Sequence, residues 1–518
     1  MAIVRWLRRR KVHCEERARL SCLPVGRASL DSLPAILTSS AVAVPEKPAL
    51  VFRNRPIPFA ELGEWVRRTA AGLQLLGVRG GDRVALLAGN VPEFVYAFFG
   101  TLSLGAVAVP LDVELAPEDL GYILADCGAR VVAAQMDLLP PVLAIRDRVP
   151  SIEHVLVMGP PPTPRGTQSF DELLDRSVGE RSAMDFNADD LAMLTYTAGS
   201  TEMPRGVMLT HGNLLAALRQ YSDVSALNLK ESDVALIVLP LSSRFAHNVL
   251  LGTALKKGAT VLLVERFDPE ETLALVQENQ VTALFGTPAM FRSWLEAVES
   301  RQVDLSSVRL ALSTLAPAPL DVVEEFRQRF GQTIWSAYGL PEAGSVLTTT
   351  ALGTAENIGS IGLPAPGLDV RLVGERGEDV EDGDPGEIIV RGPSVSNGYW
   401  NSPEQTEVAF VDGWFRTGDL AYRDEEGYLF LVGRKIDVIR VSGFNVFPSE
   451  VENVLMRHPN VAACTVSGMS NEQTGEAVKA MVTLNPGESA TEEELIQHCR
   501  GALARFKCPT VVEFREPT

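Results

Sequence analysis

The chain has 518 residues, too many for a single hydrophobic core, so two or more domains are expected. Its hydrophobic fraction of 46% and charged fraction of 22% are those of a globular protein. A formal net charge of −19 argues against nucleic acid or an anionic membrane surface as the main partner. The six cysteines show no CxxC pair and no metal-ligand spacing, which favours free thiols in a reducing, cytoplasmic compartment.

The first 30 residues are basic, unlike the rest of the chain, with eight Arg or Lys residues against two Glu. We predict a disordered basic leader; a start codon assigned too far upstream and a targeting peptide are the alternatives. No integral membrane segment is expected, because the longest uncharged run, 94–111, is interrupted by Gly100, Gly105 and Pro110.

From Leu33 onwards, short apolar strands alternate with amphipathic helices. Helices are expected over 59–76, from Pro92, and over 117–127, and strands over 84–87, 106–111 and 131–134. Further strands are expected at 234–239, 260–264 and 282–285. Regular alternation of strand and helix predicts parallel sheets covered on both faces, that is, an α/β fold.

A polar loop interrupts this rhythm between an expected strand at 191–194 and an expected helix from Gly212. It is rich in Thr, Ser and Gly and contains Arg205. Such a loop offers backbone N–H groups, hydroxyls and a cation to phosphate oxygens. It lacks the Lys-Ser or Lys-Thr pair that ends the common GxxxxGK[ST] loop. A polar turn without function is the plain alternative.

The stretch 196–207 resembles Tyr-Thr-Ser-Gly-Thr-Thr-Gly-x-Pro-Lys-Gly-Val, the signature of the adenylate-forming superfamily of acyl-CoA synthetases, adenylation domains and luciferases. The resemblance implies that Thr197, Ser200, Thr201 and Arg205 hold the phosphates of ATP. Arg205 stands where the family has Lys. Glu202 stands where it has Gly, and its carboxylate would repel polyanionic ATP.

A second stretch, 335–342, resembles the family motif Tyr-Gly-x-Thr-Glu. The resemblance implies that Tyr338 and Gly339 bind adenine and that Glu342 holds Mg²⁺, a cation that prefers hard oxygen ligands. Pro341 replaces the motif threonine and supplies neither a hydroxyl nor an N–H. Upstream, 313–317 replaces Ser-Gly-Gly-Ala-Pro, so that Leu315 stands at a glycine position beside the purine.

The next motifs along the chain are those that the resemblance assigns to binding the ribose and to the thiol step. Asp419, within Trp-x-x-Thr-Gly-Asp, and Arg434, within Gly-Arg-x-x-Asp, are implied to bind the ribose hydroxyls. Ile436 occupies the hinge about which the family's C-terminal domain swings, where β-branching stiffens the chain. Gly443 would line the thiol channel.

Two segments depart further from the family. The segment 239–243 replaces Leu-Pro-Leu-Phe-His at the border of the acyl site, and we expect His247 nearby to be a packing or surface residue. The chain ends after 511–514, before the family's Gly-Lys turn, and Lys507 belongs to an earlier motif. We therefore expect the lysine that bridges the carboxylate and the α-phosphate to be missing.

These motifs predict a large multi-sheet α/β AMP-binding N-terminal domain over 31–435 and a smaller, mobile α+β C-terminal domain over 436–518 that lacks its last segment. The implied function is an ATP-dependent, AMP-forming acid–thiol ligase with slow adenylation. Its implied cofactors are ATP, Mg²⁺ and coenzyme A, and its implied partner is a small-molecule carboxylic acid. The wording of 442–452 favours a fatty acid. A non-catalytic homologue that binds nucleotide or acyl ligand, or a fragment of an active ligase, are the alternatives.

Overall fold

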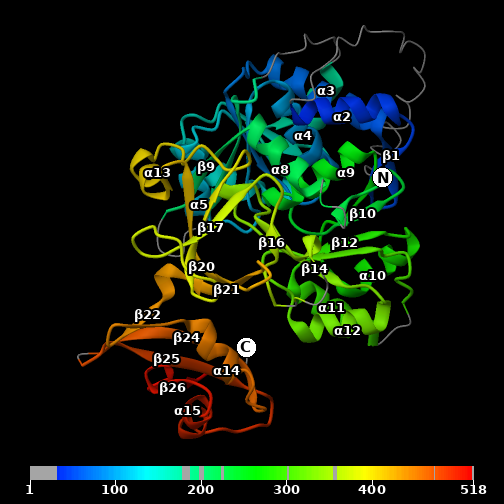
Figure 1. The fold of residues 1–518 in the computed structure, drawn as a ribbon. Helices are drawn as coiled ribbons and strands as arrows, with labels where there is room; N and C mark the ends of the chain where they lie inside the picture. The colour runs from blue at the N-terminus through cyan, green and yellow to red at the C-terminus, as the bar shows by residue number, and fades with distance from the viewer. Residues whose placement is uncertain are drawn as a thin grey trace. The chain divides into compact units, whose positions relative to one another are not determined.

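A computed structural model describes residues 32–177, 187–197, 203–222, 224, 227–299, 303–353, 357, 359–471 and 473–515 (Figure 1). The basic leader and five residues of the signature stretch, 198–202, lie outside these ranges; they include Ser200, Thr201 and Glu202. The chain divides into two compact units. The first comprises Met1–Leu368 with Arg391–Phe415, and the second comprises Asp369–Val390 with Arg416–Thr518. Every helix in the described ranges is too short or too polar to span a bilayer.

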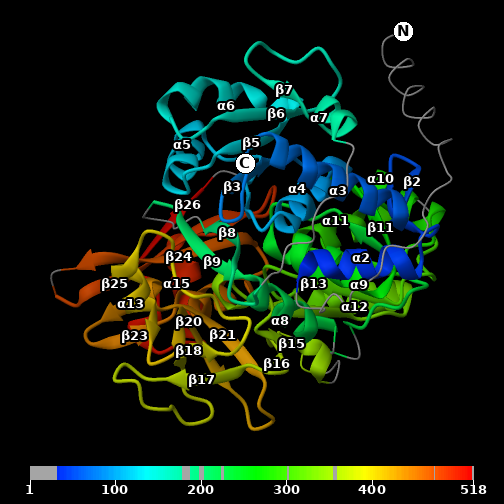
Figure 2. The same ribbon diagram turned by 90° about the horizontal axis from the view of Figure 1, so that it is seen from above.

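The first unit contains a seven-stranded sheet in the order β7-β6-β5-β3-β4-β8-β9. All neighbours in it are parallel except β8 and β9. The strands are β3 (Arg83–Leu87), β4 (Val107–Pro110), β5 (Val131–Gln135), β6 (His154–Met158), β7 (Gln168–Ser169), β8 (Leu191–Thr197) and β9 (Arg205–Thr210). The helices between them are α3 (Phe59–Leu75), α4 (Pro92–Ser103), α5 (Pro117–Asp126), α6 (Leu139–Ile145) and α7 (Phe170–Arg176). Figure 2 shows α5 and α6 beside β5 and β6, where their apolar residues share one core with those strands.

A nine-stranded sheet forms the rest of this unit, in the order β16-β15-β14-β13-β12-β10-β11-β1-β2. Its strands are β1 (Pro48–Phe52), β2 (Arg55–Pro58), β10 (Val234–Ile237), β11 (Thr260–Leu263), β12 (Ala283–Gly286), β13 (Leu310–Ser313), β14 (Ile334–Tyr338), β15 (Thr348–Thr349) and β16 (Leu363–Pro364). Its helices include α2 (Leu33–Ala43), α8 (His211–Ser222), the π-helix η4 (Phe245–Leu251), α9 (Gly252–Lys257), α10 (Pro269–Glu278), α11 (Pro288–Glu299) and α12 (Leu320–Phe330). Phe291, Trp294 and Phe326 belong to the core that α11 and α12 share with the strands of this sheet, and Figure 1 shows the two helices beside β12 and β14.

The second unit carries two smaller sheets. The first contains β17 (Asp369–Val373), β18 (Gly386–Arg391), β20 (Trp414–Arg423) and β21 (Leu429–Arg434). The short β19 (Phe410–Val411) pairs with Trp414 and Phe415, the first two residues of β20, which like β19 belong to the first unit. The second contains β22 (Ile439–Val441), β23 (Phe444–Val446), β24 (Val461–Asn471), β25 (Gly475–Leu484) and β26 (Val511–Phe514). Two helices, α14 (Pro448–Leu455) and α15 (Glu492–Arg500), share one apolar core with this second sheet. The expected α/β fold, with a large multi-sheet part and a smaller α+β part, is confirmed.

One expectation about the first unit is wrong. The stretch after Thr197 was expected to be a loop leading directly into a helix, but Arg205–Thr210 forms strand β9, antiparallel to β8. The buried side chains of Val207 and Leu209 account for this strand. The signature stretch is therefore part of a β-hairpin, and α8 begins only after its second strand.

Candidate active site

The antiparallel strands β8 and β9 bring Thr197, the last residue of β8, opposite Arg205, the first residue of β9. A third segment pairs with the other edge of β9: the Trp400 N–H donates to the Gly206 carbonyl at 2.7 Å, and the Met208 N–H donates to the Gly398 carbonyl at 3.0 Å. A Cβ at Gly206 would lie 3.0 Å from the Tyr196 ring, so a larger residue here would require that ring to shift. Arg205 therefore lies at the start of β9, the middle strand of a three-stranded segment.

Tyr399, in that third segment, joins two of the predicted site residues. The Arg205 guanidinium lies 5.6 Å from the centroid of the Tyr399 ring. The Tyr399 hydroxyl donates to Glu342 Oε1 at 3.1 Å. Arg205 and Glu342, which are 137 positions apart in the sequence, are thus brought together. Sequence analysis missed Tyr399, and only its place in the aromatic pair Tyr399-Trp400 after a glycine could have indicated it.

Glu342 is a buried carboxylate. It lies in the short 3-10 turn η5 (Pro341–Ala343), and the Ser396 N–H holds its backbone carbonyl at 2.7 Å. Burial raises the pKa of the Glu342 carboxyl, although the Tyr399 hydroxyl and the charges of Arg244 and Arg205 act in the opposite direction. Burial makes the charged form of this carboxylate unfavourable, and a bound cation would stabilise that form.

Tyr338 and Gly339 lie at the end of β14, directly before Glu342. A Cβ at Gly339 would lie 2.2 Å from the Ser345 carbonyl oxygen, so only glycine fits this crossing of two backbones. The Leu347 N–H donates to the Tyr338 carbonyl at 2.7 Å, which fixes the strand end. Pro341 opens η5 as its first residue, so its missing N–H costs the turn nothing.

Arg244 and His247 lie next to this turn at the start of the π-helix η4. His247 is fully buried, with its ring 4.8 Å from that of Phe98 and its Nδ1 2.8 Å from the Leu241 carbonyl. Burial lowers the pKa of His247 to about 4, so its expected packing role is confirmed. Arg244 is also buried, and its Nη1 donates to the Pro341 carbonyl. Sequence analysis did not single out Arg244.

Leu315, which stands where the motif Ser-Gly-Gly-Ala-Pro has a glycine, has a backbone φ of 71°. This is the left-handed region that favours glycine. Its side chain is 77% exposed, so no packing offsets the strain. The sequence-based expectation that this position suits glycine has its physical basis in this torsion angle.

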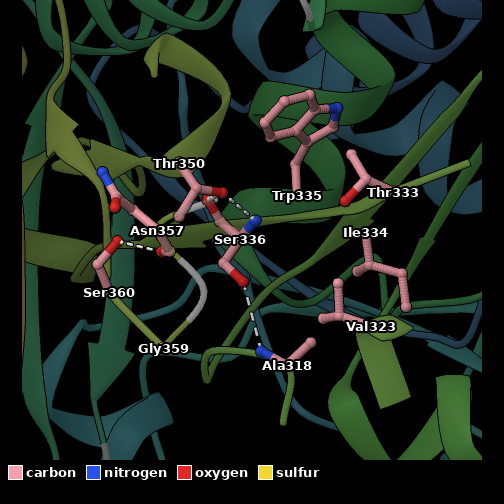
Figure 3. Close-up of a pocket in the computed structure, with 10 residues that line it drawn as sticks. All are labelled: Ala318, Val323, Thr333, Ile334, Trp335, Ser336, Thr350, Asn357, Gly359 and Ser360. Carbon is pink, nitrogen blue, oxygen red and sulfur yellow. Dashed lines mark hydrogen bonds between the residues drawn. The ribbon is translucent and has the colours of Figure 1, made fainter. Parts of the chain in front are cut away.

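A recess of about 310 Å³, open to solvent, lies beside β14 (Figure 3). The Ser336 N–H donates to Thr350 Oγ1 at 2.8 Å, and Ser336 Oγ accepts from the Ala318 N–H at 3.3 Å, which ties three walls together. The lining residues are Ala318, Val323, Thr333, Ile334, Trp335, Ser336, Thr350, Asn357, Gly359 and Ser360. None of them is a predicted site residue.

In the second unit, Asp419 and Arg434 face each other across the β20–β21 hairpin. Arg434 Nε lies 3.7 Å from Asp419 Oδ1, and the Asp419 N–H donates to Thr417 Oγ1 at 3.0 Å. Asp419 is buried, whereas Arg434 is exposed. The two predicted ribose ligands are therefore neighbours.

The residue before the predicted hinge, Lys435, pairs with the buried carboxylate of Glu387. Glu387 accepts from Arg416 Nη2 at 2.5 Å and from Lys435 Nζ at 2.9 Å. Burial alone would raise the pKa of Glu387, but these two cations outweigh it and the pKa is lowered. Lys435 directly precedes Ile436, whose side chain is 75% exposed. Gly443, at the turn between β22 and β23, has a φ of 85°, which the turn requires.

The cysteines of the described ranges are unpaired: Cys127, Cys464, Cys499 and Cys508. Burial raises the pKa of Cys127 and of Cys499 to about 12 and that of Cys464 to about 11, and it also raises the pKa of Cys508. The expectation of free thiols is confirmed for these four residues.

The described residues form a large α/β unit with two main sheets and a smaller α+β unit. A family model described as AMP-binding enzyme matches residues 37–400, and one described as AMP-binding enzyme C-terminal domain matches residues 450–517. The chain therefore belongs to the AMP-binding enzyme family, as an adenylate-forming ligase of the acyl-CoA synthetase type.

Characterised relatives span almost the whole chain. A feruloyl-CoA synthase from Amycolatopsis sp. is 37% identical over 91% of this chain and 92% of its own length. A long-chain-fatty-acid–CoA ligase from Bacillus subtilis is 32% identical over 94% of this chain and 91% of its own length. The crystal structure of ATP-bound MatB from Rhodopseudomonas palustris matches with a TM-score of 0.86 at 29% identity, covering 94% of this chain and 95% of that structure.

Proposed function

We propose that the chain joins a carboxylic acid to coenzyme A in two steps. The acid and ATP give an acyl-adenylate and pyrophosphate, and the thiol of coenzyme A then takes the acyl group and releases AMP. The observation that carries the proposal is the connected set of Arg205, Tyr399 and Glu342, which sets a cation beside a buried carboxylate at the edge of the signature hairpin. Such a pair suits a polyphosphate bound together with a metal ion.

Each predicted residue takes one part of this reaction. Thr197, Ser200, Thr201 and Arg205 would hold the phosphates; Tyr338 and Gly339 the adenine; Asp419 and Arg434 the ribose; Gly443 would line the thiol channel; and Ile436 would be the hinge. The burial and raised pKa of Glu342 fit a residue that binds Mg²⁺. Mg²⁺ bound there would neutralise charge on the phosphate oxygens.

The class of acid is a separate question. The motif wording of 442–452 supports a fatty acid, and the relatives include one enzyme named for a long-chain fatty acid and one named for ferulate. The buried, charged Arg244 next to Glu342 does not suit a purely apolar acyl site. We therefore propose a carboxylic acid and give no preference between aliphatic and aromatic chains.

We further propose that adenylation is the slower half-reaction. Pro341 has no N–H and no hydroxyl to offer to a phosphate. Leu315 is strained at the purine segment. Losing one donor to a transition state commonly costs about 10²–10³ in rate. The same two departures favour the alternative that the chain binds nucleotide without turnover.

One experiment tests these proposals together. The protein is incubated with Mg-ATP, coenzyme A and either decanoate or ferulate, and AMP and thioester are measured; a parallel reaction starts from the synthetic acyl-adenylate. We expect thioester in both, faster from the acyl-adenylate, and none from ATP with the Glu342→Gln variant. Equal rates in both would refute slow adenylation, and nucleotide binding with neither reaction would favour the non-catalytic alternative.

A further inference from the structure

Arg244 is a buried cation with few partners. Its side chain is 3% exposed, and of its three guanidinium nitrogens only Nη1 has an acceptor, the Pro341 carbonyl. Nε and Nη2 are buried without any hydrogen-bond partner, and no direct ion pair of the described ranges includes this residue, although the Glu342 carboxylate interacts with its charge from further away. Burial of a charge without a direct counter-ion is strongly unfavourable, so an anionic ligand that pairs with this arginine would be stabilised there.

Two further unpaired groups lie around the same turn. Ser396 Oγ and Ser345 Oγ are buried without a partner, while their N–H groups donate to the Glu342 and Leu340 carbonyls. Ser345 also has a backbone φ of 75°, in the region that non-glycine residues avoid. The turn 340–345 thus accepts one side-chain hydrogen bond from Arg244 and backbone hydrogen bonds from Ser345 and Ser396, and all three side chains retain unused hydrogen-bonding capacity. Buried polar groups are nearly always paired, so a cluster of exceptions indicates a ligand site.

We propose that Arg244 binds the carboxylate of the acid substrate beside Glu342. This inference rests on the proposed ligase function. The reacting carboxylate must approach the α-phosphate, and two anions repel each other in a buried site unless a cation lies between or beside them. Arg244 presents Nε and Nη2 on one edge of a planar fork, which matches the two oxygens of a carboxylate.

The alternative ligand is the triphosphate of ATP. The apolar side chains around Arg244 make this alternative less favourable. The adjoining π-helix supplies buried Phe245 and Val249, and His247 packs on Phe94 and Phe98. A small carboxylate on an apolar acyl group suits these surroundings better than a hydrated polyphosphate. Burial lowers the pKa of Arg244 only to about 9, so the side chain keeps its charge at neutral pH. Because Nε and Nη2 are covered in this conformation, binding includes a rearrangement of the covering side chains.

The test compares acids with their uncharged amides. Decanoate and ferulate, and the corresponding amides, are titrated by calorimetry into the unmodified protein and into Arg244→Met, Arg244→Lys and Arg219→Met. Arg219 lies exposed on α8, so its substitution removes the same charge without touching the turn. Mg-ATP is titrated into all four proteins.

We expect each acid to bind the unmodified protein at least tenfold more tightly than its amide. Arg244→Met should lose at least tenfold in acid affinity, about 1.4 kcal/mol, and no longer distinguish acid from amide, with Mg-ATP affinity unchanged. Arg244→Lys should be intermediate, and Arg219→Met should match the unmodified protein.

Four results would overturn the inference. Retained discrimination between acid and amide in Arg244→Met, or loss of Mg-ATP affinity in place of acid affinity, would each remove the carboxylate from Arg244. Acid and amide binding equally to the unmodified protein would do the same while leaving the ligase proposal intact. If neither the acids nor Mg-ATP bind the unmodified protein, both proposals fall. Should Arg244→Met not fold, the lysine variant carries the same comparison.

Discussion

Glu342 and Glu387 are buried carboxylates whose surroundings shift their pKa values in opposite directions. Burial dominates at Glu342 and raises its pKa, whereas Arg416 and Lys435 lower that of Glu387. In the folded protein Glu342 therefore holds its proton to a higher pH than in the unfolded chain, and Glu387 to a lower one. Each residue accordingly makes the free energy of unfolding depend on pH, with opposite sign.

Substituting each carboxylate by an amide should reveal these signs. The raised pKa of Glu342 gives stability that is present below its unfolded pKa and lost as the pH rises through its folded pKa. Glu342→Gln should therefore be more stable than the unmodified protein at neutral pH, with the difference vanishing in acid. Glu387→Gln should be destabilised at neutral pH and approach the unmodified protein as the pH falls. Urea unfolding between about pH 4 and 8 measures both; parallel pH profiles would contradict the assignment.

Leu315 is the second residue for which a single substitution is informative. Leu315→Gly should raise the free energy of unfolding by about 1 kcal/mol, because glycine adopts a φ of 71° without the steric penalty of a Cβ. Leu315→Ala keeps the Cβ and serves as the control, with no gain expected since the leucine side chain is exposed. Chemical denaturation of the three proteins provides the measurement. A gain for alanine equal to that for glycine would show that backbone strain is not the cause.

At the scale of elements, one buried amide, that of Asn213, connects the end of β9 to the segment before Tyr399. Asn213 Nδ2 donates to the Pro393 and Val395 carbonyls, both at 2.9 Å, and Asn213 Oδ1 accepts from the Thr210 N–H at 3.0 Å. The side chain thus ties the start of α8 to the segment that precedes Tyr399. One side chain thus connects the end of β9 with the segment that carries Tyr399, and both contribute to the candidate site.

Asn213→Ala should therefore lower the free energy of unfolding by about 1–3 kcal/mol, because it leaves buried carbonyls unpaired. Amide hydrogen exchange of 397–400 should accelerate, since these residues lose their anchor. Asn279→Ala is the control, because that side chain makes a single local bond to the Leu275 carbonyl at the end of α10. Unchanged exchange at 397–400 in a destabilised Asn213 variant would mean that the segment is held by β9 alone.

Elements encoded by local patterns could be predicted from the sequence. Pro92 and Pro117 begin α4 and α5 as expected, and buried apolar runs form the parallel strands. Strand β9 could not be found in this way, since one partner strand precedes it while the other, at 397–400, lies far along the chain. Tyr399 and Arg244 were missed for the same reason: their importance comes from contacts with Glu342 and Pro341 that no spacing in the sequence encodes.

At the scale of the whole molecule, the proposed hinge separates the predicted domains. Ile436→Lys should raise multiple-turnover thioester formation while leaving single-turnover adenylation unchanged, because a side chain without β-branching lets the backbone rotate more freely. Its free energy of unfolding should change by less than about 0.5 kcal/mol, as the isoleucine is exposed. Stopped-flow and steady-state rates of both proteins give the comparison. An unchanged overall rate would mean that the hinge tolerates isoleucine.

The thiols of the described ranges, three of them buried and Cys464 half-buried, matter for an enzyme that makes a mixed anhydride. An acyl-adenylate is an electrophile, and any thiolate within reach could attack it and leave the protein acylated. With a pKa of about 11, Cys464 is a thiolate in only about one molecule in ten thousand at pH 7, and Cys127 and Cys499 are thiolates less often still. Burial thus makes these side chains poor competitors for coenzyme A and protects the catalyst from its own intermediate.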